Sequence, residues 1–194
     1  MEKQQEENKL ITIDYSRNTI ELYENDKLVK TLKEVAIGKN GLTNNKQEGD
    51  LCTPTGLYNL GFAFGTKEKD YEYPYYVLNE FDYWVDDVNS SFYNQWVELT
   101  DELKKYPFSY MHTSNKVDWK SAEHLIDYSI RYELALVIEY NTKPTEKNKG
   151  SAIFFHIKSY DTTSGCIATT KENLEYIIKW LGNSQAKILI KSER

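Results

Sequence analysis

Apolar residues in this chain come in short runs that turn-forming residues interrupt, and this pattern limits the possible fold more than any other feature. Alternating apolar positions mark residues 10–23 and 28–37, and turn-prone polar residues occupy positions 16–18 and 24–26. Alternation at every second residue is typical of a half-buried strand. The 16 Tyr side chains also favour strands, because flat aromatic rings fit a pleated surface. We therefore predict a mainly β fold that opens with a meander and has a small helical component.

Further strand signals follow in the middle and at the end of the chain. The apolar runs at residues 134–140 and 152–157 are rich in β-branched and aromatic side chains, which is typical of buried central strands. Shorter signals of the same kind occur at residues 57–64, 75–78, 92–97 and 188–190. We expect these segments to complete the β structure.

Helical spacing of apolar residues occurs in two places. The clearer one covers residues 171–181, where Leu174, Ile177, Ile178 and Leu181 fall on one helical face. Thr169 with Glu172 three residues later predicts a capping box at the start of this helix, and Gly182 predicts its end. The second helix is predicted over residues 120–128.

Charge and hydropathy exclude several classes of protein. The formal net charge of -6 disfavours nucleic-acid binding, and the longest basic cluster is only Lys104 and Lys105. No apolar run approaches the roughly 20 residues that span a bilayer, and residues 1–7 are too polar for the apolar region of a signal peptide. We expect one domain over residues 9–194 after a polar tail at residues 1–8. A cytosolic start and an export signal absent from this sequence both stay open.

One stretch of the chain concentrates reactive side chains. His156 ends an apolar run, and Cys166 follows ten residues later, directly after Ser164 and Gly165. The thiolate is the nucleophilic form of cysteine, and a nearby imidazole lowers the thiol pKa from its usual value of about 8.5. We therefore expect His156 to activate Cys166. Gly165 permits close approach of a reacting carbonyl, and the N–H groups of Gly165 and Cys166 are candidates for an oxyanion hole. The alternative is a buried, inert Cys beside a core His.

Three segments of the chain carry a resemblance to a known family. Residues 49–56 (GDLCTPTG), 152–156 (AIFFH) and 164–166 (SGC) resemble, in this order, the L,D-transpeptidase catalytic domain of the YkuD type. The resemblance extends over roughly residues 9–191. It implies a mixed β-sheet or sandwich with a helix after the catalytic Cys. It also implies a Cys nucleophile that forms a thioester with a tetrapeptide stem of peptidoglycan, releases D-Ala and passes the acyl group to an amine.

The resemblance implies roles for individual residues of the AIFFH and SGC segments. By position, Cys166 is the nucleophile, His156 the base, and Gly165 a contributor to the oxyanion hole. The common family motif has a second His directly before Gly-Cys, where this chain has Ser164. Ser164 is therefore a candidate for contacting or orienting the substrate. The resemblance is closer to a branch of the family with FFH and SGC motifs.

Other residues are open as substrate-binding or orienting groups. His124 is one candidate, with pairing to solvent or Asp127 as the alternative; Tyr160 is another, and an ordinary packing role is its alternative. The common motif places Asn or Arg shortly after the Cys, and this chain has neither there. Arg131 and Lys158 are both open as substitutes for that polar group. Tyr110 is a further candidate for lining the cleft.

No cofactor and no metal are expected. The three His residues, His112, His124 and His156, lack the paired spacing typical of zinc sites. Cys52 lies in the first matched segment, where it is either a packing residue or a redox partner of Cys166.

The expected function is that of a cysteine acyltransferase. Its implied partners are peptidoglycan stem peptides and carbapenem-type inhibitors, and its implied location is extracellular or in the cell envelope. Three alternatives stay open: an L,D-carboxypeptidase of the same site in which water replaces the amine, a non-catalytic peptidoglycan-binding module, and a cytosolic thiol hydrolase. The sequence leaves the oligomeric state open.

Overall fold

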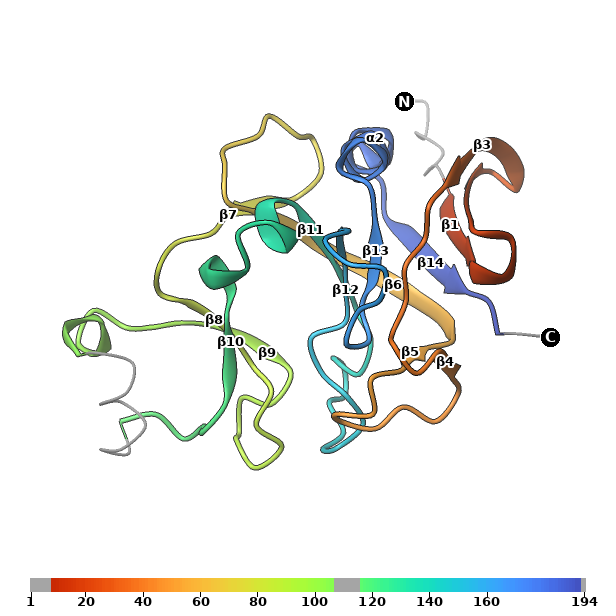
Figure 1. Ribbon diagram of the computed structural model, residues 1–194. Coiled ribbons are helices and arrows are strands. Elements are labelled where there is room, and N and C mark those ends of the chain that lie inside the picture. Colours follow the sequence, from red (N-terminus) through yellow and green to blue (C-terminus); the bar gives the residue numbers. More distant parts are fainter. Residues whose placement is uncertain (1–7, 107–115, 193–194) are drawn as a thin grey trace, which may run out of the picture.

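The computed structural model describes residues 8–106 and 116–192, and one large sheet dominates this part of the chain (Figure 1). Its strands are β1 (Lys9–Asp14), β2 (Thr19–Glu24), β3 (Lys27–Lys33), β6 (Gly56–Gly65), β7 (Tyr75–Val77), β11 (Ala135–Ile138), β12 (Phe154–Ile157), β13 (Ile167–Thr169) and β14 (Ala186–Ile190). They lie in the order β13-β12-β11-β6-β14-β1-β2-β3, and β7 pairs with β6. The predicted mainly β fold is confirmed.

The predicted N-terminal meander consists of β1, β2 and β3, which pair antiparallel. A 3-10 helix, η1 (Tyr15–Arg17), joins the first two strands. On its other side β1 pairs in parallel with β14, so the two ends of the described chain meet in the sheet. Ile11 lies opposite Leu22 on one side and opposite Ile188 on the other, and all three side chains are buried. The alternating apolar residues of β1 therefore face the core, as their spacing predicts.

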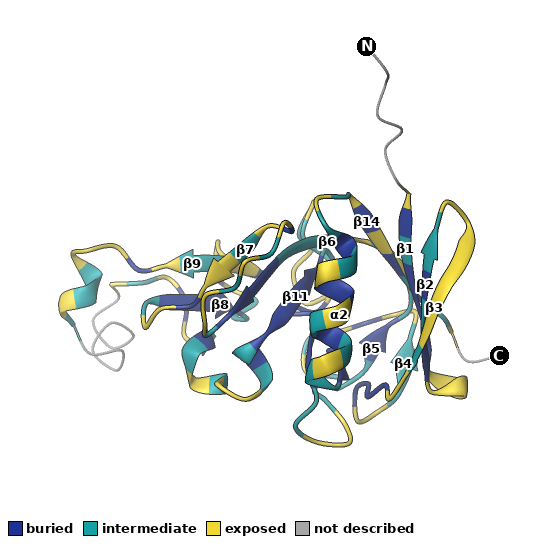
Figure 2. Cartoon of the chain, turned by 90° about the horizontal axis from the view of Figure 1, so that it is seen from above, coloured by how far each residue is buried: buried dark blue, intermediate teal, exposed yellow. Residues whose placement is uncertain are grey.

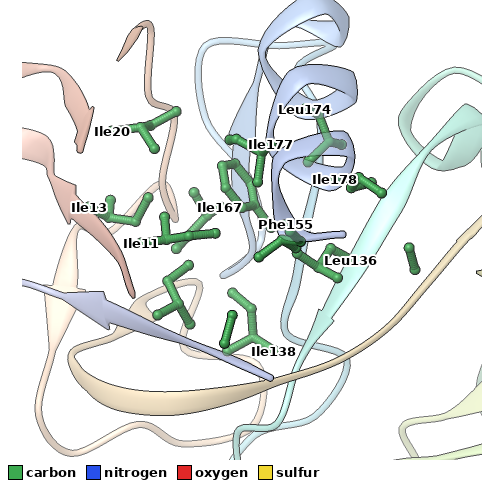
Figure 3. Close-up of a cluster of buried hydrophobic side chains, with 14 of the residues drawn as sticks. Ile11, Ile13, Ile20, Leu136, Ile138, Phe155, Ile167, Leu174, Ile177 and Ile178 are labelled. Carbon is green, nitrogen blue, oxygen red and sulfur yellow. The ribbon is translucent and has the colours of Figure 1, made fainter. Parts of the chain in front are cut away.

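Helix α2 (Lys171–Leu181) packs its apolar face against this sheet (Figure 2). Figure 3 shows Leu174, Ile177 and Ile178 of the helix gathered with strand residues such as Ile11 and Phe155 in one buried cluster. Full burial of an apolar side chain of this size contributes about 1.5–3 kcal/mol. The bounds of the helix agree with the prediction, because its apolar spacing and caps are local features of the sequence.

The start of the helix differs in one detail from the prediction. Thr170, rather than Thr169, is the N-cap, and its hydroxyl oxygen accepts a hydrogen bond from the Asn173 N–H at 3.2 Å. Thr169 instead ends β13 and donates its hydroxyl hydrogen to the Glu34 carbonyl at 2.7 Å. Thr169 is therefore part of β13, and Thr170 caps the helix. Gly182 ends the helix with a φ of 55°, as predicted.

A smaller sheet lies beside β12 and β11 and forms a second part of the fold (Figure 1). It consists of β8 (Asp82–Val85), β9 (Gln95–Glu98) and β10 (Ala122–His124), in the order β10-β8-β9. The helix predicted over residues 120–128 is therefore wrong. A strand occupies residues 122–124 because it pairs with β8, and only a 3-10 helix, η3 (Leu125–Tyr128), follows.

The remaining elements are short. They are β4 (Leu42–Thr43), β5 (Thr53–Pro54), η2 (Leu103–Lys105) and η4 (Arg131–Glu133). Among the described residues, no helix has the length and apolar character needed to cross a bilayer.

The two faces of β12 separate the large core from the site. Phe155 and Ile157 belong to the cluster under α2, whereas Phe154 belongs to a second cluster together with Phe64, Trp84 and Cys166. Side chains two residues apart on a strand point to the same face. Phe154 and His156 therefore both face the second cluster, where Cys166 lies.

Candidate active site

Cys166 and His156 come together because β12 and β13 are neighbours. The two strands pair in parallel, with His156 opposite Ala168, and Cys166 directly precedes β13. The Phe154 N–H donates a hydrogen bond to Cys166 Sγ at 3.3 Å, and Phe154 precedes His156 by two residues on the same face. The thiol and the imidazole are therefore on one face of the sheet, one strand repeat apart.

The loop that carries Cys166 is held by the segment that resembles the family motif at residues 49–56. The Thr53 hydroxyl donates to the Gly165 carbonyl at 2.8 Å. Gly165 has a φ of 143°, and a Cβ at this position would lie 3.0 Å from the Cys52 carbonyl oxygen. A side chain is therefore unfavourable at position 165 for both conformational and steric reasons.

The backbone donors of this loop differ in their availability. The Gly165 N–H donates to the Thr163 hydroxyl oxygen at 3.1 Å. The Cys166 N–H donates to no residue in the described part of the chain. Cys166 therefore has an N–H group available for an oxyanion, whereas the N–H of Gly165 already has a partner.

The Cys166 thiol is buried and protonated in this structure. The residue is 9% exposed, and Sγ donates to the Ala152 carbonyl at 3.2 Å. Burial, with a smaller contribution from the negative charge of Glu123, raises the thiol pKa to about 12. The lowered pKa predicted from the nearby imidazole is therefore wrong for this state. No hydrogen bond joins Cys166 and His156 in the structure of residues 8–106 and 116–192.

His156 is buried and neutral, and its tautomer is fixed. Nδ1 lies 2.9 Å from the Ile157 carbonyl oxygen. A carbonyl oxygen only accepts, so Nδ1 carries the hydrogen and Nε2 has a free lone pair. Burial, with a smaller contribution from the positive charge of Arg131, lowers the imidazole pKa to about 4. Nε2 is therefore in the form that a general base requires.

Glu123 and Tyr132 are site residues that no sequence pattern indicates. The Tyr132 ring lies 5.8 Å from the His156 ring and 5.6 Å from the Phe154 ring, centroid to centroid. Its hydroxyl donates to Glu123 Oε2 at 2.5 Å. Burial raises the pKa of Glu123 to about 7. Glu123 directly precedes His124, and neighbouring side chains of a strand point to opposite faces. A strand prediction for residues 122–124 would therefore have placed Glu123 on the face opposite His124.

His124 makes local contacts on the small sheet. Its Nδ1 lies 2.9 Å from Asp127 Oδ2, and its Nε2 lies 2.8 Å from the Glu80 carbonyl oxygen. The ring stacks on Tyr83 at a centroid distance of 4.6 Å. These contacts favour the structural interpretation with Asp127 as partner.

A pocket of about 390 Å³ lies beside His156. Ser164 and Tyr160, two of the residues predicted to contact substrate, line it together with His156, and Tyr160 is 72% exposed. Arg131 also lines the pocket, whereas Lys158 forms an ion pair with Asp161 at 3.2 Å. The structure thus favours Arg131 over Lys158 as the cation at the site.

The other candidates lie elsewhere. Cys52 and Cys166 are free thiols, and Cys52 Sγ faces the Asn40 and Asp50 carbonyl oxygens at 3.5 and 3.6 Å. Tyr110 and His112 lie outside the described residues. Within residues 8–106 and 116–192, no group of three or more His, Cys, Asp or Glu side chains is placed to hold a metal ion.

Glu123→Gln is expected to increase the reactivity of the Cys166 thiol. Glu123 is ionised above about pH 7, and its negative charge disfavours the thiolate of Cys166. Gln removes this charge and still offers an oxygen to the Tyr132 hydroxyl. The thiol pKa should therefore fall, and the rate of alkylation by iodoacetamide at pH 8 should rise about 3- to 10-fold. Mass spectrometry of the alkylated Cys166 peptide measures this rate.

The control for this prediction is Glu175→Gln. It makes the same chemical change on α2, where Glu175 pairs with Lys69 at 2.8 Å. Its alkylation rate should equal that of the unmodified chain. An unchanged or slower rate in Glu123→Gln would contradict the electrostatic role of Glu123.

Comparisons with known proteins give one family and a set of similar folds. Residues 8–190 match the family described as YkuD, the L,D-transpeptidase catalytic domain. A comparison with curated proteins finds no match.

Solved structures of similar fold include the helical cell shape determining protein Pgp2 from Campylobacter jejuni. A mutant of Pgp2 has a TM-score of 0.55 and 16% identity, covering 97% of this chain and 48% of that chain. Unmutated Pgp2 has a TM-score of 0.52 and 17% identity, over 97% and 49%. The LD transpeptidase LdtMt1 in complex with imipenem has a TM-score of 0.38 and 11% identity, over 95% and 58%. The chain spans about half the length of the Pgp2 structures.

The family match covers nearly the whole chain and includes the strand with His156, the SGC segment and the helix that follows. This protein therefore belongs to the family of YkuD-type L,D-transpeptidase catalytic domains.

Proposed function

We propose that this protein is a peptidoglycan L,D-transpeptidase in which Cys166 is the nucleophile and His156 the general base. The observation that carries the proposal is the shared face of β12 and the residues that precede β13, on which Cys166 lies opposite Phe154, two residues before His156. His156 has a neutral imidazole with a free Nε2 and lines the pocket. Family membership supports the substrate, a tetrapeptide stem that ends in D-Ala. The same substrate supports a location in the cell envelope or outside the cell.

The proposed reaction has two half-reactions that balance in protons. In the first, His156 Nε2 takes the thiol proton while Cys166 Sγ attacks the carbonyl carbon of the bond before D-Ala. The C–N bond then breaks, the imidazolium returns the proton to the leaving amine, and a thioester remains on Cys166. In the second half-reaction, the amine of another stem attacks the thioester and its proton passes through His156 to the sulfur.

The protonated resting thiol has a consequence for this mechanism. With a thiol pKa of about 12 and an imidazole pKa of about 4, the ion pair of thiolate and imidazolium is disfavoured before substrate binds. Proton transfer therefore accompanies attack on the substrate. The Cys166 N–H, which has no partner among the described residues, is the proposed donor to the developing oxyanion.

A non-catalytic peptidoglycan-binding module is the second candidate function, and the raised pKa of the buried thiol is the observation that favours it. Water in place of the acceptor amine would make the same site an L,D-carboxypeptidase. We also propose that carbapenems such as imipenem acylate Cys166.

Intact-mass spectrometry tests the proposal. The reduced protein is incubated with a tetrapeptide stem that ends in D-Ala, with and without an amine acceptor, and free D-Ala is quantified. A mass increase that Cys166→Ala abolishes and Cys52→Ala retains, together with D-Ala release, is the expected result. Cross-linked product with the acceptor indicates the transpeptidase, and tripeptide alone indicates the carboxypeptidase. Tight stem binding without adduct or D-Ala release would establish the binding module instead.

A further inference from the structure

The pocket beside His156 is positively charged, although the chain as a whole carries a net charge of -6. Lys39 and Arg131 both line it, together with Ser164. Two cations with a neutral hydroxyl donor are a combination that suits an anion. Such a site can bind an anion only where the cations are not already paired within the protein.

The guanidinium N–H groups of Arg131 are available as hydrogen-bond donors. Its guanidinium carbon lies 4.6 Å from the centre of the Tyr128 ring, and it forms no ion pair or hydrogen bond with a residue in the described part of the chain. The nearby acids bind other groups. Glu133 pairs with Lys67 at 2.8 Å and with Lys171 at 2.7 Å. The Glu123 carboxylate accepts from the Tyr132 hydroxyl. Arg131 is therefore held by its ring contact and stays available to a ligand.

Lys39 is positioned by the backbone of the loop that carries the SGC segment. The Lys39 N–H donates to the Thr163 carbonyl at 2.9 Å, and the Thr163 N–H donates to the Ile37 carbonyl at 2.9 Å. Its ammonium group has no ion-pair partner in residues 8–106 and 116–192. Two segments far apart in sequence thus bring unpaired positive charges to one pocket.

We propose that this pocket is a carboxylate-binding subsite, in which Arg131, assisted by Lys39, holds a free carboxylate of the donor peptide beside the reacting bond. The proposal rests on the proposed function. The planar guanidinium can donate two parallel hydrogen bonds to a carboxylate, which gives direction as well as charge. Because His156 lines the same pocket, a carboxylate held there would fix the donor next to the general base.

The donor offers carboxylates from two sources. One is the C-terminal carboxylate of the leaving residue. The other is a side-chain carboxylate on the diamino acid, which diaminopimelate has and lysine lacks. The shared chemistry is a carboxylate close to the scissile bond, and two altered peptides separate the sources.

Equilibrium binding to the Cys166→Ala protein tests the subsite without any turnover. Isothermal titration calorimetry compares three peptides: a tetrapeptide with diaminopimelate and a free C-terminal D-Ala, its C-terminal amide, and its lysine analogue. We expect one of the two altered peptides to bind about 10- to 100-fold more weakly than the parent peptide, and the carboxylate that this peptide lacks is the one that the subsite binds. Arg131→Gln should lower the affinity for the parent peptide by a similar factor. It should leave the affinity for that altered peptide unchanged. Arg131→Lys, which retains the charge, should bind the parent with intermediate affinity.

Lys187→Gln is the matched control, because it removes one exposed positive charge from β14, which lies three places from β12 in the sheet. It should leave all three affinities unchanged. Three results would overturn the subsite. Arg131→Gln could lower the affinity for all three peptides equally, or it could lower the affinity for none of them. The third such result is that the parent peptide shows no saturable binding. Release of D-Ala by the unmodified protein reports separately on the proposed function, so the two ideas can fail independently.

Discussion

Cys166→Ser lowers the rate of D-Ala release from a tetrapeptide stem by at least about 10³-fold, if Cys166 is the nucleophile. A serine hydroxyl ionises far less readily than a thiol and is a poorer nucleophile at neutral pH. Serine is close to cysteine in size, and its hydroxyl can keep the contacts to the Ala152 carbonyl and the Phe154 N–H. The loss should therefore be chemical rather than structural. The measurement is kcat/KM, together with thermal unfolding to show that the fold is retained.

Cys52→Ser is the control for this prediction. Its sulfur faces backbone carbonyls at 3.5 and 3.6 Å on the loop surface and is not bonded to Cys166. Turnover should stay within about twofold of the unmodified protein. Retention of more than a tenth of the activity in Cys166→Ser would mean that the thiol is not the nucleophile.

His156→Gln is expected to reduce kcat/KM by about 10²- to 10⁴-fold, because it removes the group that accepts the thiol proton. The double variant with Cys166→Ser should be no slower than Cys166→Ser alone, since residues that act as a unit do not have additive effects. The two residues would act independently if the fold-loss of kcat/KM in the double variant equalled the product of the losses in the two single variants.

The pH dependence of the unmodified protein gives a second test of His156. Its pKa in the folded protein is lowered to about 4, so the neutral base persists as pH falls and is lost only near that value. The acid limb of kcat/KM should therefore lie near pH 4, well below the usual imidazole value of about 6.5. An acid limb near pH 6.5 would show that the base is exposed to solvent or is another residue.

The sequence predicts those parts of the fold that depend on neighbouring residues. Helix α2 (Lys171–Leu181) has the predicted bounds, because its apolar spacing and terminal glycine act locally. The segment at residues 120–128 fails for the opposite reason. Its helical pattern of apolar residues covers only a few positions. Its conformation depends instead on the pairing of β10 with β8, which lies more than thirty residues earlier in the chain.

The same division applies to the site. A single loop joins β12, which carries His156, to β13, which Cys166 directly precedes. The short spacing of the two residues in the sequence therefore predicts that they lie close together. Arg131 reaches the site from η4, which packs on β12 only in the folded protein, and Glu123 reaches it through its hydrogen bond with Tyr132 of the same 3-10 helix. The directions of the pKa changes at Cys166 and His156 follow from burial in that packing, and spacing along the chain carries no signal for burial.

The parallel pairing of β1 with β14 has a consequence for synthesis on the ribosome. Among the described strands, β1 is the first and β14 the last, and each residue of β1 from Lys9 to Ile13 lies opposite one of β14. During translation, β1 can pair with β2 long before it can pair with β14, because the strands from β2 to β13 lie between them in the chain. The meander of β1, β2 and β3 is therefore a separate hairpin-like unit until β14 has been synthesised. Such a non-local closing step slows folding, because the whole intervening chain must be ordered before the pairing forms.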